Sequence, residues 1–324
     1  MAIASEEPDG NHRPIVVLGS VNIDLVSRTP RLPQAGETVH GGEYYRAQGG
    51  KGANQAVAAA RLCQDSVRFI AAVGNDEFGR AAVDSFKAEG LDCRYVQPQP
   101  DTATGVALIL VDHEGRNLIS VASGANAKLG PQAVAAIPEE DFRGQLLLTC
   151  LESPTATVLA ALERARSLGM KTLLNPAPAD AALEDSALLD HVDILTPNQN
   201  EAALLTGLEI DSTESAITAA RRLQDGGVPT IILTRGREGL LICEKEVHIL
   251  PAHRVESLDT TAAGDAFNGA LAAGLAQGRS LLDACGWAQA AAALSVTRRG
   301  AQPSLPRRRE VEDFLAERSP GPML

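Results

Sequence analysis

The feature that most constrains the fold is an alternation of short apolar runs with longer, alanine-rich stretches along most of the chain. A short apolar run between turn residues is typical of a buried strand, and apolar residues at every third or fourth position are typical of a helix packed on a sheet. The predicted strands are residues 15–18, 67–73, 145–150, 171–175, 192–195 and 230–234, with helices clearest at 155–168 and 212–224. Because the connections are long enough for right-handed crossovers, the sequence predicts an α/β fold with a doubly wound, mostly parallel sheet flanked by helices.

Two segments depart from this alternation. Residues 37–47 and 104–121 alternate polar with apolar side chains, and the second segment contains a turn signal at residues 112–115, Asp-His-Glu-Gly. Such a pattern is typical of antiparallel strands or a hairpin. We therefore expect a small separate sheet that needs cover on one face.

Composition narrows the class of protein. Hydrophobic residues make up 44% of the 324 residues and aromatic residues only 3%, which predicts a core of Ala, Leu, Val and Ile. The net charge of −12 argues against binding to nucleic acid or to an anionic membrane, and no apolar run approaches the roughly 20 residues that span a bilayer.

The cysteines and the N-terminus bear on the cellular compartment. Five cysteines without metal-type spacing predict a reduced, cytoplasmic protein, and residues 1–14 are expected to form a disordered tail, not a signal peptide.

The most informative motif is the stretch DTTAAGDAFNGA at residues 259–270. Ala262, Ala263 and Gly264 would leave their backbone N–H groups uncovered at a helix N-terminus, where unpaired donors and the helix dipole attract an anion. Asp265 adds a carboxylate that can act as a base. An anion hole beside a base is what the transfer of a phosphoryl group to a hydroxyl requires. The alternative is that Asp265 only stabilises the first turn of a helix.

Three further motifs accompany it in a fixed order. They are AQGGKGANQA at residues 47–56, TPNQNE at 196–201 and TRGREG at 234–239. With these four elements the chain resembles the ribokinase-like (PfkB) carbohydrate kinases from about residue 15 to residue 306. The resemblance implies one kinase domain over residues 15–318, a β-sheet lid made of segments 24–48 and 101–124 that covers the sugar, a homodimer formed through that lid, and a C-terminal tail at 319–324.

Polar residues near the first motifs are candidates for sugar binding. Asn22 and Asp24 are two positions apart, so on an extended backbone both side chains face the same side. Gly49, Gly50 and Gly52 allow a ligand to approach the backbone closely. From the residues alone, these could equally be a strand-end turn and a helix cap. The resemblance assigns sugar contacts to Asn22, Asp24, Gly50, Lys51, Asn54, Glu152 and Asp265.

The resemblance also assigns the nucleotide and metal sites. ATP would contact Asn198, Thr234, Gly236, Gly239, Gly264 and Gln289. Glu201 would organise Mg²⁺, largely through water, although it could be an ordinary first-turn acid of a helix. Arg235 and Arg237 would either add charge beside the phosphates or be solvated. An oxygen cage for K⁺ would consist of the Asp259 carboxylate, the Ser304 hydroxyl and the backbone carbonyls of Thr261, Ser295, Arg298 and Gly300.

Together these assignments predict a kinase reaction. Asp265 would take the proton from the primary hydroxyl of a sugar as that oxygen attacks the γ-phosphorus of Mg-ATP. The motifs GGKGANQA and TRRGAQPS are closer to family members that act on ribose than to fructokinases or nucleoside kinases, so we expect D-ribose to be converted to D-ribose 5-phosphate. Phosphorylation of 2-deoxyribose or another pentose is the alternative within the same class of enzyme. A binding or regulatory protein on the same fold is the alternative from a different class; it would lack the base or carry a DNA-binding segment.

Overall fold

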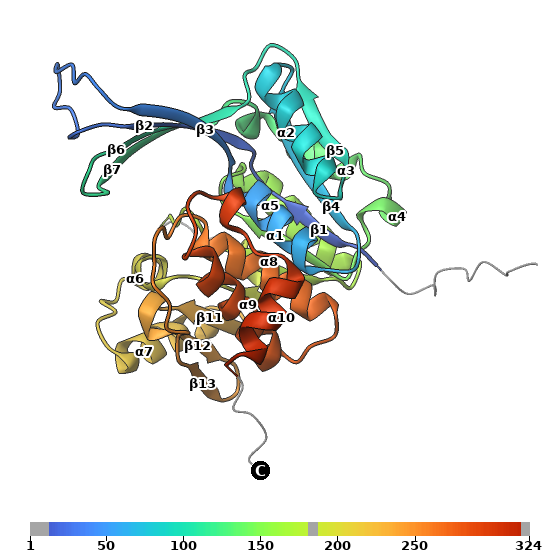
Figure 1. Ribbon diagram of the computed structural model, residues 1–324. Helices are drawn as coiled ribbons and strands as arrows, with labels where there is room; N and C mark the ends of the chain where they lie inside the picture. Colours follow the sequence, from blue (N-terminus) through green and yellow to red (C-terminus); the bar gives the residue numbers. More distant parts are fainter. Residues whose placement is uncertain (1–12, 181–186, 319–324) are drawn as a thin grey trace, which may run out of the picture.

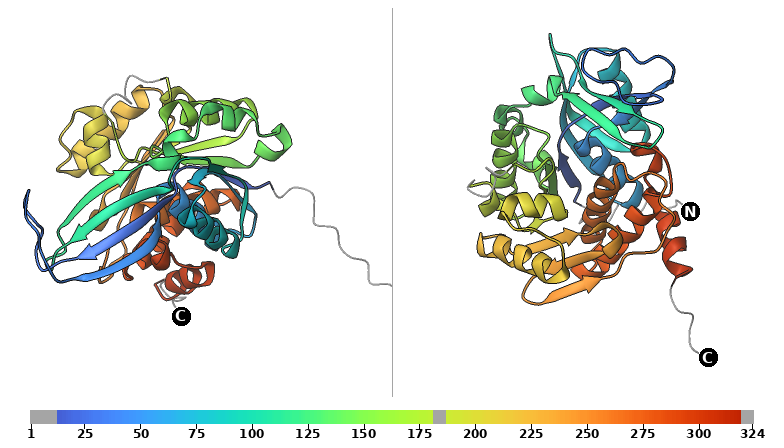
Figure 2. Two further views of the ribbon diagram at one scale, coloured as in Figure 1. Left: turned by 90° about the horizontal axis from the view of Figure 1, so that it is seen from above. Right: turned by 90° about the vertical axis from the view of Figure 1, so that its left-hand side faces the viewer.

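The computed structural model describes residues 13–180 and 187–318, so the predicted tails at 1–14 and 319–324 lie outside it except for residues 13 and 14. Within these residues a large, mostly parallel sheet lies between two layers of helices, and a small second sheet projects from one end of the molecule (Figures 1 and 2). The predicted fold class is confirmed.

The main sheet contains each of the six strands that the sequence predicted for it. In the described residues its order is β13-β12-β11-β10-β9-β8-β1-β4-β5, with parallel pairing from β11 to β5. Strands β12 and β13 extend it in antiparallel fashion, and these two strands and β5 were not predicted. The bounds are β1 Ile15–Leu18, β4 Val67–Gly74, β5 Leu91–Gln99, β8 Leu146–Cys150, β9 Lys171–Asn175, β10 Ile194–Leu195, β11 Thr230–Thr234, β12 Leu240–Cys243 and β13 Val247–Leu250.

The helices form two layers because the strands are apolar on both faces. In β1, Ile15 and Val17 point into one hydrophobic core while Val16 and Leu18 point into the other. Helices α1 (Lys51–Leu62), α2 (Glu77–Ala88), α8 (Ala263–Ala276), α9 (Leu281–Ser295) and α10 (Arg308–Ala316) cover the first core, and α3 (Pro131–Ala135), α4 (Glu139–Phe142), α5 (Thr155–Ser167), α6 (Gln199–Thr206) and α7 (Thr213–Asp225) cover the second. Among the described residues, no helix combines the length and the hydropathy needed to cross a membrane.

The second sheet is formed by the segments that were predicted to make a lid. Its strands β2 (Asn22–Arg28), β3 (Glu43–Gly49), β6 (Gly105–Val111) and β7 (Asn117–Ala122) lie in the order β3-β2-β6-β7. The turn at residues 112–115 joins β6 to β7, as expected. The predicted strand at 37–47 is shorter than expected, because pairing starts only at Glu43, and β2 was not predicted as a strand.

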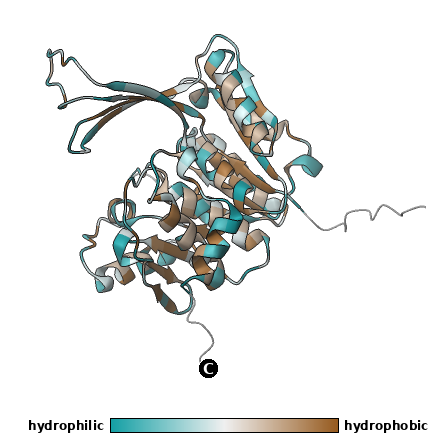
Figure 3. Cartoon of the chain, viewed as in Figure 1, coloured by the Kyte–Doolittle hydropathy of each residue, from teal (hydrophilic) through white to brown (hydrophobic). Residues whose placement is uncertain are grey.

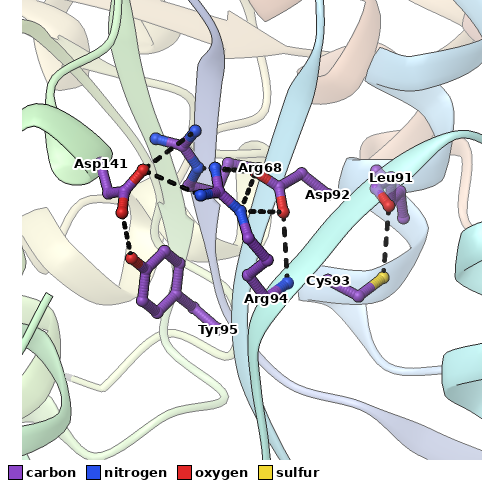
Figure 4. Close-up of polar contacts among 7 residues, drawn as sticks. All are labelled: Arg68, Leu91, Asp92, Cys93, Arg94, Tyr95 and Asp141. Atoms are coloured by element: carbon purple, nitrogen blue, oxygen red, sulfur yellow. Dashed lines mark hydrogen bonds and ion pairs between the residues drawn. The ribbon is translucent and has the colours of Figure 1, made fainter.

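Charged side chains tie the edge strand β5 to its neighbours (Figure 4). The Arg68 guanidinium on β4 donates through Nε to Asp92 on β5 at 2.9 Å. Asp141 on α4 accepts a hydrogen bond from the Tyr95 hydroxyl at 2.6 Å and pairs with Arg94 at 3.1 Å. Each carboxylate therefore has a cationic partner, which indicates that this cluster stabilises the end of the sheet farthest from β13.

Candidate active site

Asp265 lies at the centre of the predicted site. It occupies the first turn of α8, and Ala262, the residue before that helix, has a left-handed backbone with φ of 59°. The Asp265 side chain is 5% exposed. Its Oδ2 accepts a hydrogen bond from Asn54 Nδ2 at 2.9 Å, and its Oδ1 accepts one from Gln55 Nε2 at 3.0 Å. Two neighbouring amides on α1 therefore hold both oxygens of the carboxylate in place.

Close packing of α1 against α8 makes these contacts possible. A Cβ at Gly269 on α8 would overlap the backbone oxygen of Gln55 and the side chain of Ala58. Glycine at this position therefore allows the two helices to approach, and the short amide side chains can reach Asp265. The sequence analysis assigned no role to Gln55 or Gly269.

The electrostatics of the site suit a base. Burial raises the pKa of Asp265 to about 6, although the Lys51 ammonium and the amides of Asn54 and Gln55 act in the opposite direction. Burial also raises the pKa of Asp24 to about 6, with the charges of Glu152 and Asp265 adding to the shift. Burial lowers the pKa of Lys51, but the Asp265 and Glu152 carboxylates outweigh it, so the net shift is upward.

Two cavities meet at the N-terminus of α8. The smaller, of about 190 Å³, lies next to Asp265, and the larger, of about 770 Å³, lies between the end of β11 and helix α9. Both are lined by Thr234, Thr260, Ala263 and Gly264. The larger cavity has the size of a nucleotide pocket. A ligand that fills it and extends into the smaller one would place its anionic groups on the Ala262 and Gly264 N–H groups at the start of α8. The prediction of a third uncovered donor was wrong, because the Ala263 N–H donates to the Thr260 backbone oxygen at 3.2 Å and closes the turn before the helix.

The larger cavity gathers most of the residues predicted to contact ATP. Thr234, Gly236, Gly239 and Gln289 line it together with Gly264. Gly239 has φ of 93°, and a Cβ there would overlap the backbone oxygen of Leu250, so this turn requires glycine. Asn198 lines the smaller cavity instead.

The two arginines of this turn have different surroundings. Arg235 is buried, pairs with Glu238 and donates to Thr213 Oγ1 at 3.1 Å, and it lines neither cavity. Arg237 lines the larger cavity. Of the two, only Arg237 is therefore in position to meet a bound nucleotide.

Glu201 is held by the start of α6. Its Oε2 accepts a hydrogen bond from the Asn198 backbone N–H at 2.8 Å, and Asn198 Oδ1 accepts one from the Glu201 N–H at 2.9 Å, which makes a capping box. Glu201 also lines the smaller cavity with Asp265. The position of Glu201 is therefore compatible both with a role in organising Mg²⁺ through water and with a purely structural role at the start of α6.

The described residues contain no group of three His, Cys, Asp or Glu side chains that could hold a metal alone.

The residues predicted to bind the sugar lie on the lid side of Asp265. Asn22 and Asp24 lie on the same face of β2, as expected from their spacing. Glu152 Oε2 accepts hydrogen bonds from the Lys51 backbone N–H at 2.9 Å and from Ser20 Oγ at 2.5 Å. Apart from Lys51 and Asp265, the predicted sugar residues line neither cavity, so they form a separate group that meets the smaller cavity at these two residues.

Buried amide oxygens in this region have no protein partner. Asn54 Oδ1 and Gln55 Oε1 accept no hydrogen bond, although Asn54 is 5% exposed and Gln55 is fully buried. An unpaired buried acceptor costs about 1 to 3 kcal/mol. A ligand hydroxyl that reached Asn54 Oδ1 would remove this cost. Asn175, which the sequence analysis did not identify, accepts from Gln55 Nε2 at 3.1 Å and lines the smaller cavity.

The segments of the predicted cation cage lie together. Asp259 Oδ2 accepts a hydrogen bond from the Gly300 N–H at 2.9 Å, and its Oδ1 accepts from the Thr261 N–H at 2.9 Å. Although burial acts in the opposite direction, these bonds lower the pKa of Asp259. The Ser304 hydroxyl donates to the Ala301 backbone carbonyl and so keeps its lone pairs for another ligand. This donor set of oxygen atoms fits a large monovalent cation.

Comparison with known proteins gives a consistent result. A model of the pfkB family carbohydrate kinases matches residues 13–308. The ribokinase of Haemophilus influenzae is 41% identical over 302 residues, which cover 93% of this chain and 98% of that protein. The deoxyribokinase of Salmonella typhi is 38% identical over 304 residues, with coverage of 93% and 98%. The structure of Arabidopsis thaliana ribokinase complexed with ribose and ATP matches with a TM-score of 0.84 at 28% identity and covers 94% of this chain and 98% of that one.

Proposed function

Because the chain belongs to the pfkB family of carbohydrate kinases and is an enzyme, we propose that it transfers the γ-phosphoryl group of ATP to the O5 hydroxyl of D-ribose. The observation that carries this proposal is the position of Asp265. Its carboxylate lines the smaller cavity, which shares Ala263 and Gly264 with the nucleotide-sized cavity, and it accepts a hydrogen bond from Asn54. The Arabidopsis relative, whose structure contains ribose and ATP, supports the choice of both substrates.

Asp265 acts as the general base in this reaction. With a pKa of about 6 it is largely ionised at neutral pH and can accept the proton of the attacking hydroxyl. A positioned base contributes roughly 10²- to 10⁴-fold to the rate. The backbone N–H groups of Ala262 and Gly264 stabilise charge on the transferred group, and a single donor of this kind is worth roughly 10²- to 10³-fold. The Ala263 N–H is not part of this set, because it donates to the Thr260 backbone oxygen. The Lys51 ammonium adds positive charge beside Asp265.

Two metal ions complete the proposal. Mg²⁺ enters with ATP and neutralises phosphate charge; Glu201 and Asn198 hold its water shell, because Mg²⁺ dehydrates reluctantly. The Asp259 cage with Thr261, Ser295, Arg298, Gly300 and Ser304 binds K⁺, which activates the enzyme. Because Asp259 bonds to Thr261, the cage is continuous with the turn that carries the anion hole.

The sugar is D-ribose in preference to 2-deoxyribose, although the Salmonella relative is named a deoxyribokinase. The chain is 41% identical to the Haemophilus ribokinase and 38% identical to the Salmonella deoxyribokinase, so ribose is favoured. Because this difference in identity is small, 2-deoxyribose is the second candidate. A non-catalytic regulator on the same fold is disfavoured because the buried carboxylate of Asp265 and the turn at Ala262 before α8 are both present.

The lid forms a homodimer interface in this proposal. It carries large apolar side chains that are more than half exposed, among them Leu108, Ile119 and Val121, on strands that project from the body (Figure 3). Exposed apolar patches on a sheet favour association, and a second copy supplies a matching surface. All five cysteines are free, which is compatible with a reducing compartment such as the cytoplasm.

The direct test is ATP consumption by the purified protein across a panel of sugars, with the product identified by NMR. D-ribose should give the highest kcat/KM and a product that carries phosphate on O5. A higher kcat/KM for 2-deoxyribose would reassign the substrate but keep the kinase. If ATP and D-ribose both bind but no sugar of the panel leads to consumption of ATP, the proposed reaction is contradicted.

A further inference from the structure

Asn126 makes a set of contacts that the reaction described above does not use. It lies in the short helix η1 (Gly124–Lys128), which follows the last lid strand β7, and it is 2% exposed. Its Oδ1 accepts a hydrogen bond from the Val21 N–H at 2.8 Å, and its Nδ2 donates to the Val21 backbone oxygen at 3.0 Å. The same Nδ2 donates to Asn22 Oδ1 at 2.8 Å.

These bonds determine how both amides are oriented. The N–H and C=O groups of the Val21 backbone cannot exchange places, so only one orientation of the Asn126 amide satisfies both of them. In that orientation Asn126 Nδ2 must meet the oxygen of the Asn22 amide. Asn22 therefore directs its oxygen toward Asn126, and its NH₂ group remains as the donor available to a ligand.

A glycine leaves the space that this pair needs. Asn22 on β2 lies opposite Gly105 on β6 in the lid register. A Cβ at Gly105 would overlap both Asn22 Oδ1 and Asn126 Nδ2. Any larger residue at position 105 would therefore separate the two amides. The arrangement thus depends on three residues from separate parts of the chain, and all three belong to the lid or its end.

We propose that Asn126 is a positioning residue that makes Asn22 a hydrogen-bond donor to the sugar and connects the end of the lid to the sugar site. The inference rests on the proposed assignment of Asn22 to the sugar. Asp24 lies on the same face of β2, roughly 7 Å along the strand, and its ionised carboxylate accepts hydrogen bonds. A sugar hydroxyl between the two side chains accepts from Asn22 and donates to Asp24. The pair selects a group that can do both, which is an alcohol.

A double-mutant cycle tests this role. Asn22→Ala removes the donor, and Asn126→Ala removes the group that orients it, so each should raise the KM for D-ribose roughly tenfold. The KM for ATP should not change in either variant. Because Asn126 acts through Asn22, the double variant should be no worse than Asn22→Ala alone. Asn117→Ala, which changes an exposed asparagine on β7, is the matched control and should leave the KM for D-ribose unchanged.

The outcomes separate this proposal from the proposed function. If D-ribose is phosphorylated and the two KM effects multiply in the double variant, Asn126 is a structural residue only and the positioning role is wrong. The same conclusion follows if the KM for ATP and the KM for D-ribose rise together. If Asn126→Ala does not fold, Gly105→Ala separates the same amides and should give the same rise for D-ribose alone; no rise would overturn the proposal. Absence of D-ribose turnover by the wild type would instead contradict the proposed function.

Discussion

Replacing Gln55 with methionine should move the pH profile of the enzyme. Gln55 Nε2 donates to Asp265 Oδ1 at 3.0 Å, and this bond favours the ionised carboxylate. Methionine has a similar size but no donor. The variant Gln55→Met should therefore bind a proton at Asp265 more readily than the wild type does.

The size of the effect follows from the pKa of Asp265. Folding raises this pKa from 3.8 to about 6, so the active, ionised form is lost as the pH falls through about 6. In the wild type, kcat/KM should fall roughly tenfold from about pH 7 to about pH 5, whereas an unshifted aspartate would give a nearly flat profile. A hydrogen bond to a charged group is worth about 1.5 to 3 kcal/mol, and hence the acidic limb of Gln55→Met should lie roughly one pH unit higher.

The assay is kcat/KM for D-ribose at saturating ATP across this pH range. Gln277→Met is the matched control, because Gln277 donates to the Leu62 backbone oxygen and does not touch Asp265. Asp24 also has a pKa of about 6, so the acidic limb of the pH profile could arise from either Asp24 or Asp265, and the assay must distinguish them. If Gln55→Met leaves the limb in place and Asp24→Asn removes it, the limb belongs to Asp24 and the reasoning about Asp265 is refuted.

Three further predictions concern the sugar, the cation and the lid. Asp24→Ala should weaken D-ribose binding by at least ~10-fold and leave ATP binding unchanged in calorimetry, because one buried partner of the sugar is lost; equal losses for both ligands would indicate a folding defect instead. Replacing K⁺ with Na⁺ at constant ionic strength should lower the rate if Asp259 belongs to a cation cage, and an unchanged rate would remove that cage from the account. Ile119→Lys with Val121→Lys should convert a dimer into a monomer in light scattering, whereas Leu204→Lys, at an exposed position on α6, should not; a wild-type monomer would contradict the lid interface.

The alternation of apolar runs was sufficient to predict the parallel sheet. Strands buried on both faces, such as β1 and β8, are short and continuously apolar, so they are visible in a single sequence. Strand β2 was missed because its polar residues Asn22, Asp24 and Ser27 interrupt the apolar pattern. Strands were predicted in the regions of its partners β3 and β6, but no local signal indicates that these strands pair with β2, for example with Gly49 and Gly105 opposite Asn22.

The motifs predicted where the site would form but not how its residues are held. Asn54 and Asp265 were expected near each other, and their side chains are in direct contact. The contacts of Gln55 with Asp265 and of Asn126 with Val21 join residues 210 and 105 positions apart. Such pairings depend on helix packing and on the lid register, which residue spacing does not determine.

The central claim is that Asp265 is the base, and the most direct test is the turnover of Asp265→Asn with D-ribose and ATP. The amide preserves the shape of the side chain and cannot accept the proton. Single-turnover phosphorylation should fall by at least ~10²-fold, while calorimetry should still detect binding of D-ribose. The variant should also be at least as stable as the wild type at neutral pH, because a buried carboxylate whose pKa is raised from 3.8 to about 6 reduces stability progressively between these pH values and by the full amount above them. Turnover close to that of the wild type would contradict the account.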